Sequence, residues 1–285
     1  MKNYPSIAII GAGVMGEAIL AGVLRNKLTR PEDIYISDPI VERRNELTER
    51  YGIHALTENI ETISNVKDLI ILAVKPQQMD DVYRDLKGQI PEHVLVLSIV
   101  AGTSIELITN GLGLTSVVRA MPNTPAQIGE GITVWYPSKP VKPDQMELAR
   151  KVLEAMGQEV QVKEETYLDM ATALSGTGPA YAFMFMEAMI DAGVHLGFSR
   201  KISEQLVLQT LRGSVDYYIA KKNVHPAQLR NEVTSPGGTT AAALYQLEKM
   251  GFRTAISRAI WAAYERSLEL GRGKKVKDPE KDNND

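Results

Sequence analysis

The chain has 285 residues, of which 44% are hydrophobic and 24% charged, a composition typical of a soluble globular protein with one large domain or two ordinary ones. It contains no cysteine, which excludes disulfides, thiolate metal sites and a cysteine nucleophile. Its four histidines lack the spacing of paired metal ligands on a helix, so we expect no metal site. The net charge of −3 does not favour binding to nucleic acid or to an anionic membrane, so neither is expected as a partner.

The first residues do not resemble a targeting segment, because the short apolar run that follows Met1–Pro5 is soon interrupted by glycines. No stretch reaches the roughly 20 apolar residues that span a bilayer. We therefore expect a cytoplasmic protein.

The first half of the chain alternates short β-branched runs with amphipathic segments, which is typical of a doubly wound parallel sheet. The predicted strands are Ile7–Ile10, Ile34–Ser37, Leu69–Val74, Val94–Ile99, Ser116–Ala120, Gly131–Tyr136 and Glu159–Lys163. The predicted helices are Gly16–Arg25, Val41–Arg50, Asp80–Lys87, Ser104–Leu112 and Pro143–Met156. We assign residues 1–163 to an N-terminal α/β domain that binds a dinucleotide.

The second half reads as long helices, which predicts an all-helical domain over residues 164–270. The stretch Tyr167–Leu196 is apolar on nearly every side, so its helix needs cover from its own domain or from a second subunit. Residues 271–285 are charged and without periodicity, which predicts a disordered tail. The remaining predicted helices are Ser203–Lys222, Pro226–Val233, Thr240–Met250 and Phe252–Leu270.

A glycine motif stands between the first strand and the first helix. Gly11 permits a tight turn, Gly13 lets the backbone approach a pyrophosphate, and Gly16 allows close packing of helix on strand. The helix N-terminus then faces the anion. We therefore predict that a nicotinamide dinucleotide binds at Gly11, Gly13, Val14, Met15 and Gly16. The alternative is a glycine-rich turn in some other α/β protein.

The end of the second strand bears on the choice between NAD and NADP. Asp38 follows Gly16 at about the offset at which an acid bonds the ribose 2′-hydroxyl of NAD, and its charge would repel a 2′-phosphate. Arg43 and Arg44 are close enough in sequence to receive that phosphate, and Ser37 is a neutral donor. Asp38 is equally well explained as a helix cap ahead of Pro39. The sequence therefore leaves NADH or NADPH open.

Three further segments lie at the ends of predicted strands. Ala73-Val74-Lys75-Pro76 stands at the carboxyl edge of the sheet, where open α/β folds bind ligands, so Lys75 is a candidate for cofactor ribose or phosphate. The small residues of Ser98–Gly102, Ala101 among them, allow a nicotinamide ring to lie close to the backbone. Asn123 lies between two prolines in the loop Arg119–Pro125, which we place at the rim of the active site.

The helical half contains a turn rich in hydroxyls, Thr234-Ser235-Pro236-Gly237-Gly238-Thr239-Thr240, which opens a predicted helix. Free N–H groups at a helix N-terminus together with Ser and Thr hydroxyls suit a carboxylate. Ordinary capping by Thr239 or Ser235 is the alternative, but capping explains only one hydroxyl. The turn therefore favours anion binding.

These motifs, together with Leu174-Ser175-Gly176-Thr177-Gly178-Pro179-Ala180-Tyr181, give the chain a resemblance to pyrroline-5-carboxylate reductases from Ile7 to Leu270. The resemblance implies a Rossmann-type domain followed by a helical dimerisation domain, so a homodimer that often assembles into a decamer. It also implies reduction of the small molecule 1-pyrroline-5-carboxylate to L-proline by NADPH or NADH, the last step of proline biosynthesis. Asp38 departs from the neutral residue that is commoner in the family, which puts the usual NADPH preference in doubt.

Site roles follow from the same resemblance. Ser235 and the amides of Gly238 and Thr239, beside Gly237, are expected to hold the substrate carboxylate, and Thr240 to bond the ring nitrogen. Thr240 and Ser235 are thus the candidate catalytic residues. By the resemblance, Asn59, Lys75 and Ala101 are expected to contact the cofactor. The further cofactor candidates in the segments described above are Ser37, Asp38, Ala73, Val74, Pro76 and Asn123.

Two other functions remain open at this stage. A β-hydroxyacid dehydrogenase or related imine reductase shares the domain order, but such enzymes place a catalytic lysine on the long interdomain helix and Leu168–Gly193 contains none. A regulator that binds NAD(P) without turnover is the other candidate, and it would not need a carboxylate site at Thr234–Thr240.

Overall fold

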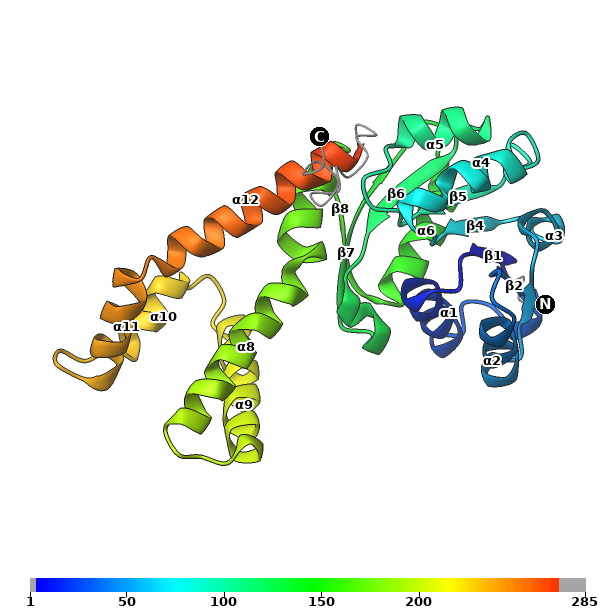
Figure 1. Cartoon of the computed structure of the whole chain (residues 1–285). Helices are drawn as coiled ribbons and strands as arrows, with labels where there is room; N and C mark the ends of the chain where they lie inside the picture. The colour runs from blue at the N-terminus through cyan, green and yellow to red at the C-terminus, as the bar shows by residue number, and fades with distance from the viewer. Residues whose placement is uncertain (1–3, 272–285) are drawn as a thin grey trace, which may run out of the picture. The chain divides into compact units, whose positions relative to one another are not determined.

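The computed structural model describes residues 4–271, which form two compact units (Figure 1). The first unit contains the residues up to Thr177 together with those from Ala262 on, and the second runs from Gly178 to Trp261. The predicted domain boundary at residues 163 and 164 stays a prediction. Of the predicted disordered tail, only Gly271 falls within the described residues, where it ends the last helix.

The first unit is built on one eight-stranded sheet, with the order β3-β2-β1-β4-β5-β6-β7-β8. Neighbouring strands pair in parallel, except that β6 and β7 are antiparallel, with Arg119 opposite Tyr136. The predicted parallel sheet is therefore confirmed except at this pair, where β7 runs antiparallel to β6. The turn η3 (Thr124–Ile128) joins these two strands and is too short for the crossover that a parallel pair requires. The strands are β1 (Ile7–Ile10), β2 (Ile34–Ser37), β3 (His54–Leu56), β4 (Leu69–Leu72), β5 (Leu95–Ser98), β6 (Val117–Met121), β7 (Gly131–Pro137) and β8 (Gly157–Gln161).

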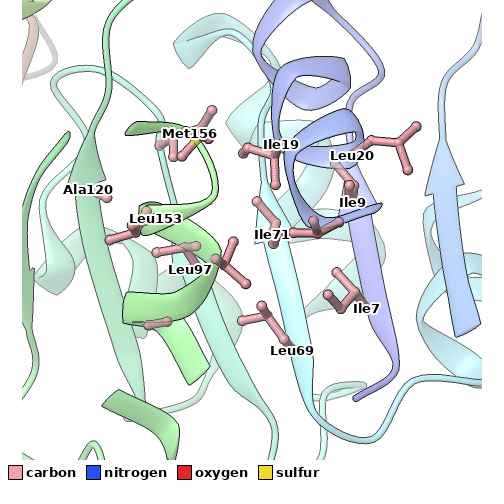
Figure 2. Packing of buried hydrophobic residues seen from close by; sticks show 14 of the residues in the cluster. Ile7, Ile9, Ile19, Leu20, Leu69, Ile71, Leu97, Ala120, Leu153 and Met156 are labelled. Carbon is pink, nitrogen blue, oxygen red and sulfur yellow. The ribbon is translucent and has the colours of Figure 1, made fainter. Parts of the chain in front are cut away.

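Helices cover both faces of this sheet. Ile7 and Ile9 of β1 belong to one core, with helices α1 (Val14–Arg25), α2 (Val41–Tyr51) and α6 (Pro143–Glu154). Figure 2 shows Ile9 and Ile71 packing beside the side chains of α1. The alternate residues of the same strands face a second core, which is completed by α3 (Asn59–Ser64), α4 (Met79–Leu86) and α5 (Ile105–Leu112). Burial on both faces explains why the central strands read as unbroken apolar runs.

One strand and one α-helix of the first unit, β3 and α3, have no counterpart among the sequence predictions. Strand β3 has only three residues, and none of them is fully buried. Helix α3 has six residues, of which Thr62 and Ile63 are buried. Both elements are too short to show a hydrophobic period, which is the signal on which sequence prediction depends.

The first unit continues through α7 (Tyr167–Ala171) and the π-helical turn η4 (Thr172–Gly176). The predicted single helix Tyr167–Leu196 is therefore interrupted, and its remainder is α8 (Gly178–His195). Met121 packs closely against this turn, because a Cβ on Gly176 would lie 2.7 Å from Met121 Cε. The hydroxyl of Thr177 completes the turn by donating to the carbonyl of Thr172 at 2.8 Å.

The second unit consists of helices with much exposed apolar surface. Helix α8 has no buried residue, and the side chain of Met184 is 74% exposed. The helices are α8, α9 (Arg200–Ala220), α10 (Pro226–Glu232), α11 (Thr239–Lys249) and the first part of α12 (Phe252–Gly271). Among residues 4–271, none of the helices combines the length and the hydropathy needed to cross a membrane.

Candidate functional site

The glycine motif lies where the strand order reverses, at the carboxyl ends of β1 and β4. Gly11 has φ +102°, and a Cβ there would lie 2.8 Å from the carbonyl oxygen of Ala73. A Cβ on Gly16 would lie 2.1 Å from the carbonyl oxygen of Gly11, so each of these positions requires glycine. A Cβ on Gly13 would meet no described heavy atom within 4 Å. Gly13 therefore leaves its backbone open to a ligand, at the N-cap of α1.

A pocket of about 500 Å³ opens beside this motif, at the ends of β1, β2, β3 and β4. Four strands therefore contribute to one rim, as the carboxyl edge of an open α/β sheet does when it binds a dinucleotide. The predicted cofactor residues that line the pocket are Gly11, Gly13, Ser37, Asp38, Asn59, Ala73, Val74 and Lys75.

The other predicted cofactor residues lie elsewhere in the first unit. Val14 and Gly16 belong to the first turn of α1, where Val14 is exposed and Gly16 buried, and Met15 packs against the core. Pro76 begins the short turn η2 (Pro76–Gln78). Ala101 follows β5. The next residue is Gly102, and a Cβ added there would lie 3.0 Å from Leu270 Cβ of α12.

Asn123 is held at both ends of its side-chain amide. Its Nδ2 donates to the carbonyl of Ser175 in the π-helical turn at 3.2 Å, and its Oδ1 accepts from the amide of Ile132 at 3.0 Å. The side chain thus joins the start of β7 to η4 within the first unit. The structure assigns Asn123 contacts that position the loop, and its predicted role at the cofactor stays a prediction.

Asp38 is fixed directly after β2 by two backbone amides. Its Oδ2 accepts from the amide of Ala12, inside the glycine motif, at 3.1 Å, and its Oδ1 accepts from the amide of Ile40 at 2.9 Å. The residue at the N-cap of α2 is Ile40, and among residues 4–271 no side chain caps that helix. The carboxylate therefore braces the pocket rim, and the capping role that the sequence also allowed is not the one observed.

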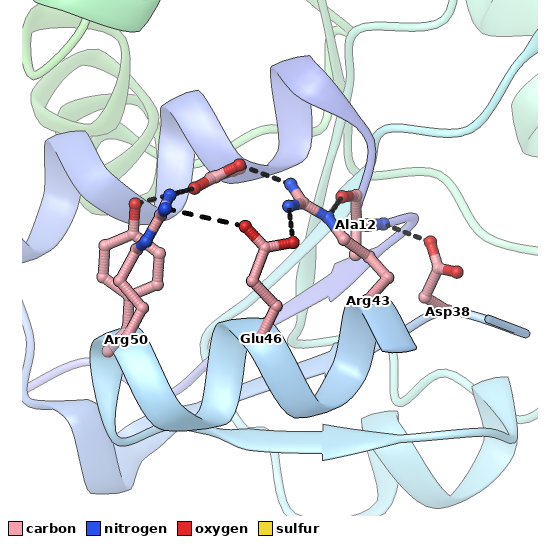
Figure 3. A network of polar contacts seen from close by, with 7 residues as sticks. Ala12, Asp38, Arg43, Glu46 and Arg50 are labelled. Atoms are coloured by element: carbon pink, nitrogen blue, oxygen red, sulfur yellow. Dashed lines mark hydrogen bonds and ion pairs between the residues drawn. The ribbon is translucent and has the colours of Figure 1, made fainter. Parts of the chain in front are cut away.

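Arg43 is fully engaged within the first unit. Its Nε donates to the carbonyl of Ala12 at 2.8 Å, its Nη1 contacts Glu46 at 2.7 Å, and its Nη2 pairs with Glu17 (Figure 3). Burial on its own lowers the pKa of Arg43, but hydrogen bonds from its guanidinium to Glu17 and Glu46 outweigh burial and raise it.

Glu17 is the centre of this network on α1. Burial on its own would raise the pKa of the Glu17 carboxyl, whereas hydrogen bonds from Arg43, Tyr51 and Arg50 together hold it below its ordinary value. The carboxylate is thus ionised, and it neutralises the arginine that stands nearest to the glycine motif. Arg44, the other candidate for a phosphate, donates to the carbonyl of Asp38 at 2.6 Å.

Ser37 and Asn59 are linked along the opposite side of the pocket rim. The Ser37 hydroxyl donates to Asn59 Oδ1 at 2.8 Å, and Asn59 Nδ2 donates to Asp85 Oδ2 at 2.8 Å. Sequence reasoning missed the acidic residues of this rim, Glu58, Asp81 and Asp85, which also line the pocket. The signal for them is positional, because residues that follow β3 and η2 must reach the same sheet edge.

The hydroxyl-rich turn lies in the second unit and opens α11, which begins at Thr239 with Gly238 as its N-cap. No side chain caps the helix within the described part of the chain, so capping by Thr239 or Ser235 is excluded. The Gly238 amide donates to the carbonyl of Ser235 at 3.1 Å. A Cβ on Gly238 would lie 2.5 Å from Ser235 Oγ, so glycine is what allows this hydroxyl to approach the helix start.

The turn therefore presents a set of donors in one place. The first amides of a helix have no partner within it and attract anions. In contrast, the hydroxyl of Thr234 donates to the carbonyl of Arg230 at 2.6 Å and serves the backbone of α10. Ser235, Thr239 and Thr240 are thus the hydroxyl residues of this turn that suit a carboxylate.

Two family models match the chain. Residues 6–102 match a model described as NADP oxidoreductase, coenzyme F420-dependent, and residues 165–270 match one described as pyrroline-5-carboxylate reductase dimerisation. The first match contains the glycine motif and the pocket, and the second contains the turn at Thr234–Thr240. The dimerisation match supports a homo-oligomer.

Individual relatives match over almost the whole chain. A pyrroline-5-carboxylate reductase of Synechocystis is 44% identical over 266 residues, which cover 93% of this chain and 98% of the relative. The crystal structure of a pyrroline carboxylate reductase of Plasmodium falciparum with NADP bound has a TM-score of 0.86 at 32% identity, covering 95% of this chain and 99% of that one. A Coxiella burnetii reductase has a TM-score of 0.85 at 35% identity, covering 94% and 99%. The predicted two-part fold, an N-terminal Rossmann-type domain followed by a helical dimerisation domain, is confirmed, and the chain belongs to the pyrroline-5-carboxylate reductase family.

Proposed function

We propose that this chain reduces 1-pyrroline-5-carboxylate to L-proline with a hydride from NAD(P)H, the last step of proline biosynthesis. The observation that carries the proposal is the start of α11, where an uncapped helix N-terminus and the hydroxyls of Ser235, Thr239 and Thr240 stand together. A small imino acid has one carboxylate and one ring nitrogen, and this turn offers donors for both.

The carboxylate is held by the Ser235 hydroxyl and the amide of Thr239. The Gly238 amide already donates to the Ser235 carbonyl, so its main contribution is to admit Ser235 Oγ beside the helix start. Gly237, with φ +72°, forms the turn that precedes it. The positive end of the helix dipole adds attraction for the anion.

The Thr240 hydroxyl orients the ring nitrogen and relays to it a proton that comes from water. An imine accepts a hydride more readily once its nitrogen is protonated, and a small cyclic imine takes that proton from water. A strong protein acid is therefore not required. The work of this turn is to hold the carboxylate and the nitrogen in one orientation, which is catalysis by proximity and by preorganised donors.

The pocket of the first unit fits a nicotinamide dinucleotide, since Gly13 leaves its backbone open and the α1 N-terminus stands beside it. When bound, NAD(P)H supplies the hydride. Gly11 and Gly13 receive the pyrophosphate, and Lys75 provides the positive charge on the pocket rim.

The finer features of assembly and location belong to the same proposal. Chains pair through residues 165–270, and the resulting dimers associate into a decamer. The enzyme works in the cytoplasm on a small molecule, with neither nucleic acid nor membrane as a partner.

The test compares Thr240→Ala and Ser235→Ala with the unchanged protein in steady-state kinetics. We expect Thr240→Ala to lower kcat/KM for the imine by about 100-fold, as when one preorganised donor is lost, and Ser235→Ala to act mainly by raising KM. The dissociation constant for the cofactor should stay unchanged in both. Thr48→Ala, on the exposed surface of α2, is the control. Near-normal kcat/KM in Thr240→Ala contradicts the assignment.

A further inference from the structure

The pocket that fits the dinucleotide is strongly acidic. Four carboxylates line it, and Lys75 is the one cationic side chain among the described residues of its lining. A ribose 2′-phosphate brings a further charge of about −1.5 to −2 near neutral pH, whereas the 2′-hydroxyl of NADH is neutral and can donate a hydrogen bond. The four carboxylates are those of Asp38, Glu58, Asp81 and Asp85.

Asp38 is the carboxylate placed against the ribose. It follows β2 directly, and its Oδ2 is held at 3.1 Å by the amide of Ala12 inside the glycine motif. An acid at this point of the fold accepts hydrogen bonds from the ribose hydroxyls. Because Ala12 and Ile40 hold both oxygens, the carboxylate cannot turn away without losing two hydrogen bonds.

The cations that would offset a 2′-phosphate are already committed. Arg43 uses Nε, Nη1 and Nη2 for Ala12, Glu46 and Glu17 (Figure 3). If Arg43 turned towards a 2′-phosphate, the Glu17 carboxylate, which is 20% exposed, would lose its ion pair with Arg43. Arg44 is directed to the carbonyl of Asp38 at 2.6 Å. Lys75 enters the pocket from β4, on the other side of β1 from β2.

From this arrangement we infer that Asp38 makes the chain selective for NADH over NADPH, with Glu17 acting as a positioning residue that keeps Arg43 away from the 2′-position. The inference rests on the proposed use of NAD(P)H and deepens it. It sets this chain apart from the Plasmodium falciparum relative, whose structure has NADP bound.

The test measures dissociation constants of NADH and NADPH by titration calorimetry with the full chain and no imine. The unchanged protein should bind NADH at least about tenfold more tightly than NADPH, which corresponds to about 1.4 kcal/mol. Raising the ionic strength should narrow the ratio, because the repulsion is screened. Equal affinities, or tighter NADPH binding, overturn the inference.

Two variants locate the effect. Asp38→Ser should strengthen the binding of NADPH and weaken the binding of NADH. The preference for NADH, measured as the ratio of the two dissociation constants, should fall at least about tenfold. Asp33→Asn, which changes a carboxylate at the opposite end of β2, should leave the ratio unchanged. A substitution that only disturbs the glycine motif would weaken the binding of both cofactors to the same extent and leave their ratio of dissociation constants unchanged. An unchanged ratio in Asp38→Ser therefore overturns the inference. Since no turnover is measured, loss of imine reduction would refute the proposed function and leave this result standing.

Discussion

Tyr83 on α4 carries a buried hydroxyl that has no hydrogen-bond partner among the described residues. Its ring is packed tightly, since a Cβ on Gly111 of α5 would lie 2.5 Å from Tyr83 Cδ1. Burial, with the nearby charge of Asp80 as a smaller cause, raises the pKa of Tyr83 to about 12 from its ordinary 10.0. An unpartnered buried donor costs stability that a phenylalanine would not.

We expect Tyr83→Phe to raise the free energy of unfolding by about 1 kcal/mol near neutral pH. The pKa of Tyr83 is higher in the folded protein than in the unfolded chain, so the unfolded chain ionises first as the pH rises. The contribution of neutral Tyr83 to the free energy of unfolding is therefore fully present below pH 10.0 and is lost as the pH rises towards about 12. The advantage of Tyr83→Phe should therefore grow over that range. Urea unfolding of both proteins across the range measures it, and a clear loss of stability in Tyr83→Phe near neutral pH would show that the hydroxyl has a partner in solution.

Residues whose backbone sets their identity were the most predictable from sequence. At Gly11 and Gly16 an added Cβ would clash with a carbonyl oxygen, so the glycines of the motif indicate the local backbone conformation directly. The role of Arg43 was not predictable, because its partner Glu17 is 26 residues away in sequence and meets it only in the folded sheet. The contact of Gly238 with Ser235 Oγ likewise depends on the exact path of the turn.

At the scale of elements, the Glu17 network ties α1 to α2. Because the pKa of Glu17 is lowered in the folded protein, the network stabilises the fold above the ordinary carboxyl pKa of 4.5 and loses that effect as the pH falls through the lowered value. Glu17→Gln should cost about 1–2 kcal/mol near neutral pH and progressively less in acid. Denaturant unfolding at several pH values tests this, with Glu42→Gln on the exposed face of α2 as control. A cost that is independent of pH would contradict it.

A second buried network joins β6 to two helical segments of the first unit. Arg119, whose side chain is 6% exposed, pairs with Glu165 at 2.9 Å and Asp169 at 3.2 Å. Asp169 also accepts from the Ser267 hydroxyl of α12 at 2.9 Å, and Glu165 accepts from the Ile105 amide at 2.7 Å. The segments on either side of the second unit are thus anchored to one arginine.

Arg119→Met should destabilise the first unit by about 3 kcal/mol, because two partly buried carboxylates lose their cation. Adding Glu165→Gln and Asp169→Asn should restore part of the lost stability, because these substitutions remove the two carboxylate charges that no longer have a cation. Thermal and urea unfolding compare the single and triple variants. If the triple variant is no more stable than Arg119→Met, the loss comes from packing and the ionic explanation is wrong.

Element prediction succeeded where a hydrophobic period was long enough to read. The bounds of β1 and β2 agree with the structure, because their runs are apolar and end at glycine or aspartate. The π-helical turn Thr172–Gly176 was missed because its residues continue the apolar pattern of a helix. Its cause is tertiary, with Asn123 bonding the Ser175 carbonyl and Met121 packed on Gly176.

At the scale of the whole molecule, the second unit of a single chain leaves apolar side chains uncovered, and a dimerisation model matches residues 165–270. Met184→Glu should therefore weaken the oligomer strongly, since the charge would be buried against the partner subunit. Ile128→Glu is a matched control, because Ile128 in the first unit is also 74% exposed. Light scattering after size exclusion measures the mass, and an oligomer unaffected by Met184→Glu would contradict this role.

Domain division shows what sequence resolves at this scale. The predicted boundary after residue 163 stays a prediction, and the dimerisation match begins at residue 165. The compact units divide instead after Thr177 and before Ala262, because the Arg119 network holds α7 and the end of α12 to the sheet. Contacts between residues almost 100 positions apart leave no local mark in the sequence.

The most direct test of the central claim follows the absorbance of reduced nicotinamide when the purified chain is mixed with 1-pyrroline-5-carboxylate and either NADH or NADPH. We predict rapid consumption that requires the imine and forms L-proline in equal amount. It should be about 100-fold less efficient in Thr240→Ala and should proceed at lower cofactor concentration with NADH. Binding of imine and cofactor without consumption would contradict the account.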